Sequence, residues 1–253
     1  MNKNDLLFYN AYESFYKMAE TSNAFHSFCK DAFGADFSQD GFSNLEQIDM
    51  IRQYIPKNDN VNILDIGCGN GKMLGYLQEK TNAHIYGFDF SEEAIKTAKN
   101  LFPRNSQFLE GVIGEIDYSE EMFDVIISMD TMYFTKDMNA LVSQIKKWLK
   151  PEGVFFVGYQ EGDVMPKTPN IHTTMLSKAF VKNDMKYEAL DITEQTYELL
   201  QAKRISAISH LNEFEAEGHR EWFDMLIGQT ECVTDTLEKF NKKMARYIYV
   251  ARK

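Results

Sequence analysis

The stretch Ile63-Leu64-Asp65-Ile66-Gly67-Cys68-Gly69-Asn70-Gly71 places three alternate glycines directly after a short apolar run. The apolar residues at 61–66 predict a buried strand, and the residues at 72–80 predict a helix. Glycine lets the backbone turn sharply and approach a ligand, and the start of a helix offers free N–H groups to an anion. The stretch therefore predicts a ligand-binding turn between a strand and a helix.

Strands and helices alternate around this turn between about residues 46 and 160. The hydrophobic pattern predicts strands at 84–88, 107–109, 123–129 and 154–159, and helices at 45–54, after Ser91 and at 138–149. Such alternation is typical of a parallel, doubly wound sheet with right-handed crossovers. Ligands of these sheets bind beyond the carboxyl ends of the strands, where the glycine turn also falls.

The two ends of the chain differ from this alternating centre. Residues 5–37 predict an aromatic-rich helical arm, 186–193 and 246–251 predict two more strands, and the residues between these strands are strongly helical. We expect a single α/β domain over residues 1–253, with a doubly wound, mostly parallel seven-stranded sheet. Its expected parts are an N-terminal helical arm (1–44), a Rossmann-like core (45–193 and 245–253) and a helical lid (194–244) inserted before the last strand.

Composition limits the class of protein. The chain has 253 residues, of which 44% are hydrophobic and 26% charged, as is typical of a soluble globular domain. Its net charge of −11 argues against nucleic acid as a partner, since a binder needs a basic stripe. The basic residues concentrate at Lys239, Lys242, Lys243, Arg246, Arg252 and Lys253. We interpret this group as a solvated helix face and tail, with a site for an anionic substrate group as the alternative.

Cysteine use and hydropathy indicate the compartment. Cys29, Cys68 and Cys232 are odd in number and form no C-x-x-C pair, which argues against a disulfide framework or a zinc site. No apolar run approaches the ~20 residues of a membrane span, and residues 1–5 lead into no signal-peptide core. We expect a cytoplasmic protein without a metal or a membrane partner, and the oligomeric state stays open.

Two acidic residues distinguish between nucleotide ligands. Asp89 ends the strand after the glycine turn, where a carboxylate accepts hydrogen bonds from ribose hydroxyls. Asp65 precedes Gly67 by two residues, where a carboxylate can reach the cationic amino group of a methionine moiety, and a dinucleotide has no such cation. Lys72 stands where the G-x-G-x-x-G turn of nicotinamide-binding folds has its third glycine. The pattern favours an adenosylmethionine cofactor over a nicotinamide one.

Four motifs, in order, resemble those of class I S-adenosylmethionine-dependent methyltransferases. They are residues 61–73, Asp89-Phe90, residues 123–128 and the turn Leu149-Lys150-Pro151-Glu152-Gly153. The resemblance covers about residues 45–160 and implies the class I methyltransferase fold, S-adenosylmethionine as cofactor and a small-molecule acceptor. It implies cofactor contacts from Asp65, Gly67, Cys68, Gly69, Asn70, Gly71, Asp89, Phe90, Val112, Ile113 and Met129, with Ser38 and Gln47 near the methionine end.

The loop after the fourth predicted strand faces the reacting methyl group in this family. The resemblance implies that Asp130 orients or deprotonates the acceptor or attracts a cationic one, with capping of the next helix as the alternative role. It implies that Tyr133 lines the acceptor pocket, with plain packing as the alternative. Many relatives have histidine where this chain has Phe134, which cannot transfer protons.

The arm, the lid and the end of the fifth predicted strand supply candidate contacts to the acceptor: Tyr9, Tyr12, Tyr16, Tyr159, Arg204 and Trp222. The arm is otherwise explained as a packed amphipathic helix. Aromatic faces attract cations, which together with Asp130 and the acidic composition favours N-methylation. The layout also resembles phosphoethanolamine-type N-methyltransferases, where the pair Lys242-Lys243 would meet a phosphate. The alternatives are O- or C-methylation of an aromatic or isoprenoid metabolite, and a non-catalytic cofactor-binding regulator.

Overall fold

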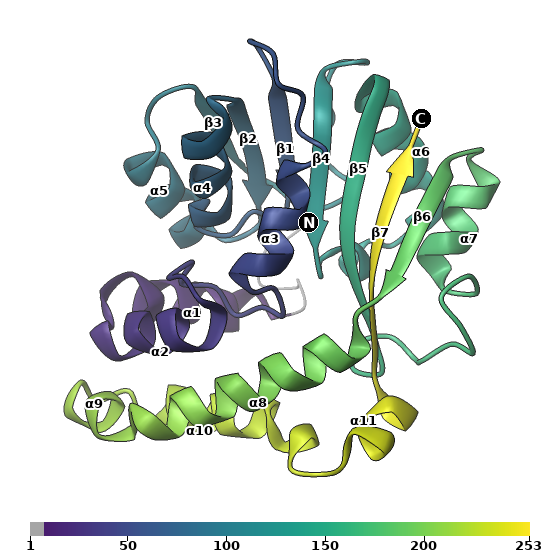
Figure 1. Cartoon of the computed structure of the whole chain (residues 1–253). Coiled ribbons are helices and arrows are strands. Elements are labelled where there is room, and N and C mark those ends of the chain that lie inside the picture. Colours follow the sequence, from purple (N-terminus) through teal and green to yellow (C-terminus); the bar gives the residue numbers. More distant parts are fainter. Residues whose placement is uncertain (1–7) are drawn as a thin grey trace.

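A central sheet of seven strands organises the protein in a computed structural model that describes residues 8–253 (Figure 1). The strand order is β3-β2-β1-β4-β5-β7-β6, and β7 runs antiparallel to both of its neighbours. The strands are β1 (Asn62–Ile66), β2 (His84–Asp89), β3 (Ser106–Glu110), β4 (Phe123–Met129), β5 (Leu149–Glu161), β6 (Lys186–Asp191) and β7 (Ala245–Arg252). The predicted doubly wound, mostly parallel seven-stranded sheet is confirmed.

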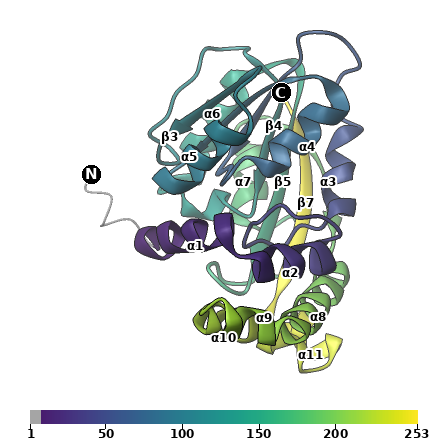
Figure 2. The same ribbon diagram turned by 90° about the vertical axis from the view of Figure 1, so that its left-hand side faces the viewer.

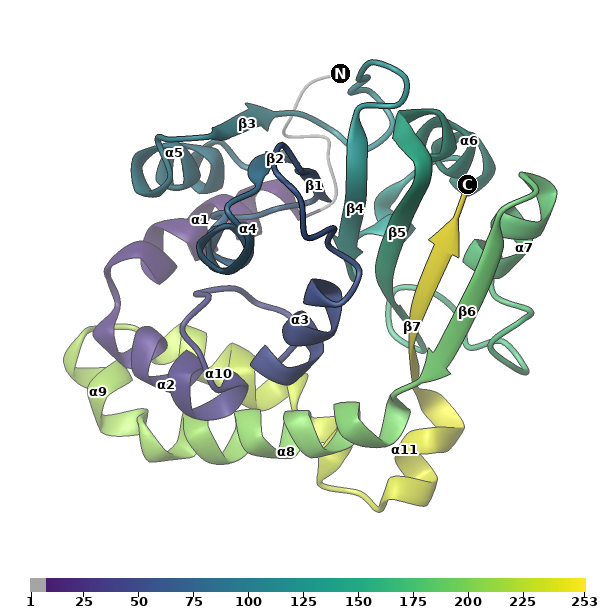
Figure 3. The same ribbon diagram turned by 45° about the horizontal axis from the view of Figure 1, so that its top comes forward.

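Helices cover both faces of the sheet because successive residues of a buried strand point to opposite sides. Ile63 of β1 packs with α3 (Leu45–Arg52), α4 (Lys72–Thr81) and α5 (Glu92–Leu101). Its neighbour Leu64 packs on the other face, with α6 (Met138–Trp148) and α7 (Met175–Lys182). Figure 3 shows α3 and α4 in front of the strands and α6 behind them. The continuous apolar run of β1 is therefore buried on both sides, as parallel strands require.

The remaining helices lie beyond the carboxyl ends of the parallel strands (Figures 1 and 2). The arm consists of α1 (Tyr9–Thr21) and α2 (Asn23–Phe33), and the lid of α8 (Thr193–Ser209), α9 (Leu211–Ala216), α10 (Arg220–Gln229), the 3-10 helix η3 (Glu231–Val233) and α11 (Leu237–Lys243). Phe15 and Phe25 of the arm share one apolar cluster with Phe214 and Phe223 of the lid. Arm and lid thus form a common layer over one edge of the sheet.

Some elements differ from their predicted form. The arm is broken at Ser22, whose hydroxyl accepts a hydrogen bond from the Phe25 N–H and donates one to Glu217 of the lid. Helix α7 was not predicted, and β5 begins at Leu149, which pairs with Phe123; the next pair is Val125 with Val154, so the extra residues of this irregularity lie in β5. The first residues of the predicted arm, 5–7, lie outside the described residues.

No helix in the described part of the chain is both long and apolar enough to cross a membrane.

Gly162 directly follows β5 and packs against Lys243 and Met244, which precede β7. Its φ is +101°, and a Cβ atom there would overlap the carbonyl oxygen of Lys243. We expect Gly162→Ala to lower the free energy of unfolding by about 1–3 kcal/mol, because both the backbone conformation and the contact resist a side chain. Urea unfolding followed by circular dichroism measures this.

The matched control is Gly228→Ala in α10, where no atom lies within 4 Å of the added methyl group. We expect this variant to be as stable as the parent or slightly more stable, since alanine favours a helix. Equal losses in the two variants would contradict the assigned role of Gly162.

Candidate functional site

A cavity of about 690 Å³ lies between the strand ends and the layer formed by arm and lid. This volume falls within the range of about 300–1,000 Å³ that is usual for small-molecule sites. Gly67 after β1, Asp89 at the end of β2 and Asp130 after β4 line one side of it. Tyr12 from the arm and Trp222 from the lid line the other. Sheet, arm and lid therefore all contribute to the site.

The glycine turn has little room for side chains. Gly67 has a φ of +77°, and a Cβ atom there would lie 2.6 Å from Cγ2 of Thr131. At Gly69, with a φ of +52°, the added atom would overlap the hydroxyl group of Tyr16. Of the predicted turn residues only Gly67 lines the cavity; Cys68, Gly69, Asn70 and Gly71 are packed beneath it.

Asp89 lines the cavity and is held by two backbone N–H groups. Its Oδ2 accepts a hydrogen bond from Gly69 at 3.0 Å and its Oδ1 accepts one from Ser91 at 2.9 Å. Burial raises the pKa of Asp89 to about 6, and these two backbone donors oppose the rise. The group is therefore ionised at neutral pH. A carboxylate has about four acceptor positions, so two stay available for hydroxyl groups in the cavity.

Asp65 is buried two residues before Gly67 and does not itself line the cavity. Its Oδ1 has no hydrogen-bond partner among residues 8–253. Burial, with a smaller contribution from the charge of Asp89, raises its pKa well above the usual range. A buried acceptor without a donor is costly, so this oxygen suits a ligand that brings its own N–H groups. The amino group of a methionine moiety fits this requirement.

The residues predicted at the adenine end also line the cavity. Phe90 follows Asp89, and Val112 and Ile113 follow β3. The ring of Phe90 lies 5.7 Å from that of Tyr12 and 5.8 Å from that of Tyr9, measured between centroids. Tyr9 therefore supports Phe90 from outside the cavity and does not line it.

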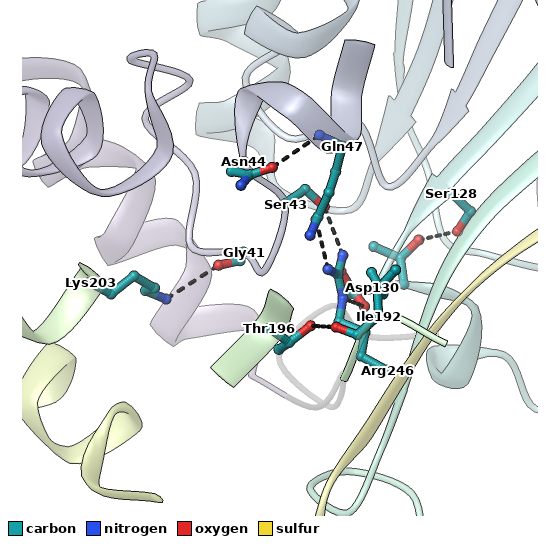
Figure 4. Close-up of polar contacts among 11 residues, drawn as sticks. Gly41, Ser43, Asn44, Gln47, Ser128, Asp130, Ile192, Thr196, Lys203 and Arg246 are labelled. Atoms are coloured by element: carbon teal, nitrogen blue, oxygen red, sulfur yellow. Dashed lines mark hydrogen bonds and ion pairs between the residues drawn. The ribbon is translucent and has the colours of Figure 1, made fainter. Parts of the chain in front are cut away.

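Asp130 and Arg246 form a buried bidentate ion pair (Figure 4). Arg246 donates from Nε to Oδ1 at 3.0 Å and from Nη2 to Oδ2 at 2.7 Å. The Arg246 side chain is 1% exposed, so its interpretation as part of a solvated tail is wrong. Both oxygens of Asp130 are bound to the guanidinium group, so the predicted roles of orienting, deprotonating or attracting an acceptor stay predictions.

Arg246 also explains the position of Gln47, which was predicted near the cofactor. The Gln47 Oε1 accepts a hydrogen bond from Nη1 of Arg246 at 2.9 Å. Gln47 does not line the cavity, and its Nε2 has no partner within the described part of the chain. Gln47 therefore supports Arg246 in this structure.

Aromatic side chains form much of the remaining wall. Tyr133 and Phe134, in the 3-10 helix η2 (Met132–Phe134), face the cavity together with Tyr12, Tyr16 and Trp222. Burial and, to a smaller extent, the nearby Asp130 raise the pKa of Tyr133 well above its usual range. Tyr133 is thus a protonated hydrogen-bond donor at neutral pH. No lysine, arginine or histidine lines the cavity among the residues that the structure describes.

Several predicted residues lie away from the cavity. Asn70 donates to the carbonyl oxygens of Phe37 and Ser38 at 3.1 and 3.0 Å, and the Ser38 hydroxyl accepts from Lys72 at 2.7 Å. Both residues thus fasten the glycine turn to the chain before α3. The position of Ser38 does not support a direct cofactor contact, because its hydroxyl is already bound.

The predicted acceptor contacts of Arg204 and Tyr159 are likewise not supported by their positions. Arg204 lies on α8 and donates to the carbonyl oxygen of Ile227 at 2.9 Å. Tyr159 lies in β5, fully buried, with its ring 6.2 Å from that of Tyr133. Neither residue lines the cavity. Tyr159 can influence the site only through Tyr133.

One part of the wall has no regular structure. Residues 39–43, which we call the cavity segment, all line the cavity between α2 and α3. Thr131, Gln160, Asp163 and Val164 line it as well. The resemblance indicated the region of the segment through Ser38 and Gln47, but it identified none of the residues 39–43 as part of the wall.

Comparisons with known proteins agree with this geometry. A family model described as a methyltransferase domain matches residues 57–208. Phosphoethanolamine N-methyltransferase of Plasmodium falciparum is 31% identical over 129 residues, which are 49% of this chain and 48% of that protein. This chain therefore spans about half the length of that curated relative.

Solved structures show the same fold. Phosphoethanolamine N-methyltransferase 2 of Haemonchus contortus, in complex with phosphomonomethylethanolamine and S-adenosylhomocysteine, has a TM-score of 0.76 at 17% identity and covers 96% of this chain and 60% of its own. A cyclopropane synthase of Mycobacterium tuberculosis has a TM-score of 0.71 at 15% identity, with 96% and 98% covered. At these identities the likeness concerns the fold alone.

The assignment of Asp65 and Asp89 predicts that variants of these two residues differ in which of two ligands they weaken. S-adenosylhomocysteine carries an amino-acid group, and 5′-methylthioadenosine has the same adenosine moiety without it. We expect Asp89→Asn to weaken both ligands about tenfold or more, because the ribose loses a charged acceptor. We expect Asp65→Asn to weaken S-adenosylhomocysteine alone by a similar factor.

Isothermal titration calorimetry with both ligands measures these affinities. The two variants control for each other, since each replaces one buried carboxyl group beside the same turn. Equal weakening of both ligands by Asp65→Asn would remove this residue from the amino-acid end of the cofactor.

Proposed function

The chain belongs to the methyltransferase-domain family, and from this premise we propose that it transfers a methyl group from S-adenosylmethionine to a small-molecule amine without a phosphate group. The observation that carries the proposal is the composition of the cavity wall. Its described residues include aromatic rings and four aspartates, and they include no basic side chain. Such a wall suits a cation or a neutral amine with an apolar body.

The chain holds residues for each part of the cofactor. Asp89 would accept hydrogen bonds from the ribose hydroxyls, and the unpartnered Oδ1 of Asp65 would accept from the amino group. Phe90, Val112 and Ile113 would enclose the adenine. When bound, S-adenosylmethionine supplies a methyl group on a positively charged sulfur, which makes that group reactive without further activation.

Positioning is then the main contribution of the protein. Tyr12, Tyr133 and Trp222 surround the space next to the strand ends, exclude water and restrict the orientation of an acceptor. Asp130 is bound by Arg246, and the raised pKa of Tyr133 keeps that group protonated. Neither side chain is a ready base. An amine attacks with its free lone pair and loses a proton late, whereas a phenol benefits more from a base, so the wall favours N-methylation.

The charges of the wall favour a cationic acceptor over an anionic one. Asp40 is bound by Lys203 and Gln229, and Asp130 by Arg246. Asp163 is exposed, lines the cavity and forms no hydrogen bond or ion pair with any described residue. A free carboxylate attracts cations to the cavity and repels a phosphate.

This distribution differs from what a phosphate-bearing acceptor requires. The basic pair Lys242-Lys243, which the resemblance placed near a phosphate, does not line the cavity. Lys242 is 69% exposed and pairs with Glu238 at 2.7 Å on the surface of α11. We therefore propose an acceptor without phosphate, unlike the acceptors that the names of the phosphoethanolamine methyltransferases indicate.

O- or C-methylation of an apolar metabolite is the second candidate. The observation that favours it is the apolar rim, where Phe8 and Val164 line the cavity and are 49% and 41% exposed. Such a rim suits a long apolar substituent. It is compatible with an amine as well, so the reacting atom has to be identified in the product.

Labelled methyl transfer to matched acceptors tests the proposal. Ethanolamine and phosphoethanolamine differ only in the phosphate, and phenylethylamine and 2-phenylethanol differ in the reacting atom. We expect kcat/KM to be higher for the phosphate-free amine by about a hundredfold, because unbalanced like charges cost several kcal/mol. We expect phenylethylamine to be methylated faster than 2-phenylethanol.

A preference for phosphoethanolamine would contradict the proposed acceptor class. Faster transfer to the alcohol would favour O-methylation. Binding of S-adenosylhomocysteine without transfer to any compound of a metabolite pool would favour the non-catalytic regulator.

A further inference from the structure

We propose that Lys203 and Arg246 are positioning residues that hold the cavity segment closed over the site. Lys203 acts from the lid and Arg246 acts from the core. The segment, residues 39–43, contributes five consecutive residues to the wall. Its position therefore decides how enclosed the cavity is.

The cavity segment does not hold itself in place. It lies between the end of α2 and the start of α3 and has no helical or strand structure. Within the described part of the chain, its backbone forms no hydrogen bond to the backbone of another residue. Its position therefore depends on side chains: Gln39 of the segment donates from Nε2 to the carbonyl oxygen of Cys68 at 3.5 Å, and further contacts come from side chains of the lid and the core.

Lys203 is the contact from the lid. It lies on α8 with a side chain that is 1% exposed, and its Nζ donates to the carbonyl oxygen of Gly41 at 3.3 Å. The same Nζ lies 3.6 Å from Oδ1 of Asp40 and 5.4 Å from the ring centroid of Phe42. These three partners are consecutive residues of the segment. A buried ammonium group without them would be costly, so burial of Lys203 and closure of the segment require each other.

Arg246 is the contact from the core. Its Nη2 donates to the hydroxyl of Ser43 at 2.8 Å, in addition to the pair with Asp130 (Figure 4). Its backbone meets the start of the lid: Arg246 N–H donates to Thr193 Oγ1 at 3.0 Å, and its carbonyl accepts from Ile192 at 2.9 Å. One residue thus connects the last residue of the segment with the point where the chain enters the lid.

Lys203 attaches the segment to the lid, and Arg246 attaches it to the sheet. Lys203, and Gln229 through its 2.8 Å bond to Asp40, belong to the lid and would move with it. Ser43 is attached to Arg246 in the sheet. Displacement of the lid therefore pulls residues 40–42 away, while Gln39 stays bound to Cys68 and Ser43 to Arg246. That this movement admits and releases ligands rests on the proposed function, whereas the restraint of the segment does not.

Limited chymotrypsin digestion of the full chain without ligand tests the restraint, because Phe42 offers a cleavage site within the segment. We expect cleavage after Phe42 to become about tenfold faster in Lys203→Met and in Ser43→Ala, because each variant removes a restraining contact. Cleavage after Phe123 of β4 stays as slow as in the parent. The control is Lys242→Met, the same change on the lid surface, which leaves cleavage in the segment unaltered.

Dissociation of S-adenosylhomocysteine supplies a second readout. Trp222 lines the cavity and reports occupancy by its fluorescence, with Trp222→Phe to identify its signal. We expect Lys203→Met to release the ligand about tenfold faster with little change in its association rate.

Unchanged cleavage after Phe42 in both Lys203→Met and Ser43→Ala would overturn the proposal, as would equally faster cleavage after Phe123, which indicates global destabilisation. Faster cleavage after Phe42 in a protein that methylates no acceptor would leave this inference standing and refute the proposed function.

Discussion

The buried ion pair between Arg246 and Asp130 connects the parts from which the site is built. The guanidinium group of Arg246 binds three residues from different parts of the protein. Asp130 follows β4 in the sheet, Ser43 is the last residue of the cavity segment, and Gln47 lies in α3. Burying two charges costs several kcal/mol per ion unless further hydrogen bonds complete the pair. Ser43 and Gln47 provide these bonds, so the arrangement around Arg246 is stable only when sheet, segment and α3 are assembled together.

The pair also shapes the chemistry of the cavity. It binds the carboxylate of Asp130, which has a φ of +59° and follows β4, in one orientation. Because both carboxylate oxygens of Asp130 are bound to Arg246, Asp130 is not free to act as a base. Under the proposed function, the protein acts through enclosure and alignment, which suits a donor whose methyl group is already activated. Asp89 and Asp65 are the proposed contacts to the cofactor and the aromatic wall is the proposed contact to the acceptor, so different elements would recognise the two ligands.

Much of the fold could be predicted from the sequence, because strands buried on both faces and the glycine turn leave local patterns. Asp89, Phe90 and Asp130 could be placed at strand ends for the same reason. The burial of Arg246 could not be predicted. In the sequence this residue belongs to a group of basic residues near the end of the chain, and its burial depends on Asp130, which is 116 positions away. The cavity segment has no periodicity, so only the packed structure shows which of its residues form the wall. Ser38 and Asn70 were placed near the cofactor, but they bind the turn itself, a distinction that needs side-chain geometry.

A double-mutant cycle between Asp130→Asn and Arg246→Met tests the central role of the pair most directly. The free energy of unfolding is measured for the parent, both single variants and the double variant. We expect each single change to cost about 3–5 kcal/mol, because it leaves an uncompensated buried group, and the double change to cost far less than the sum. Additive losses would show that the two side chains stabilise the protein independently and would contradict this account.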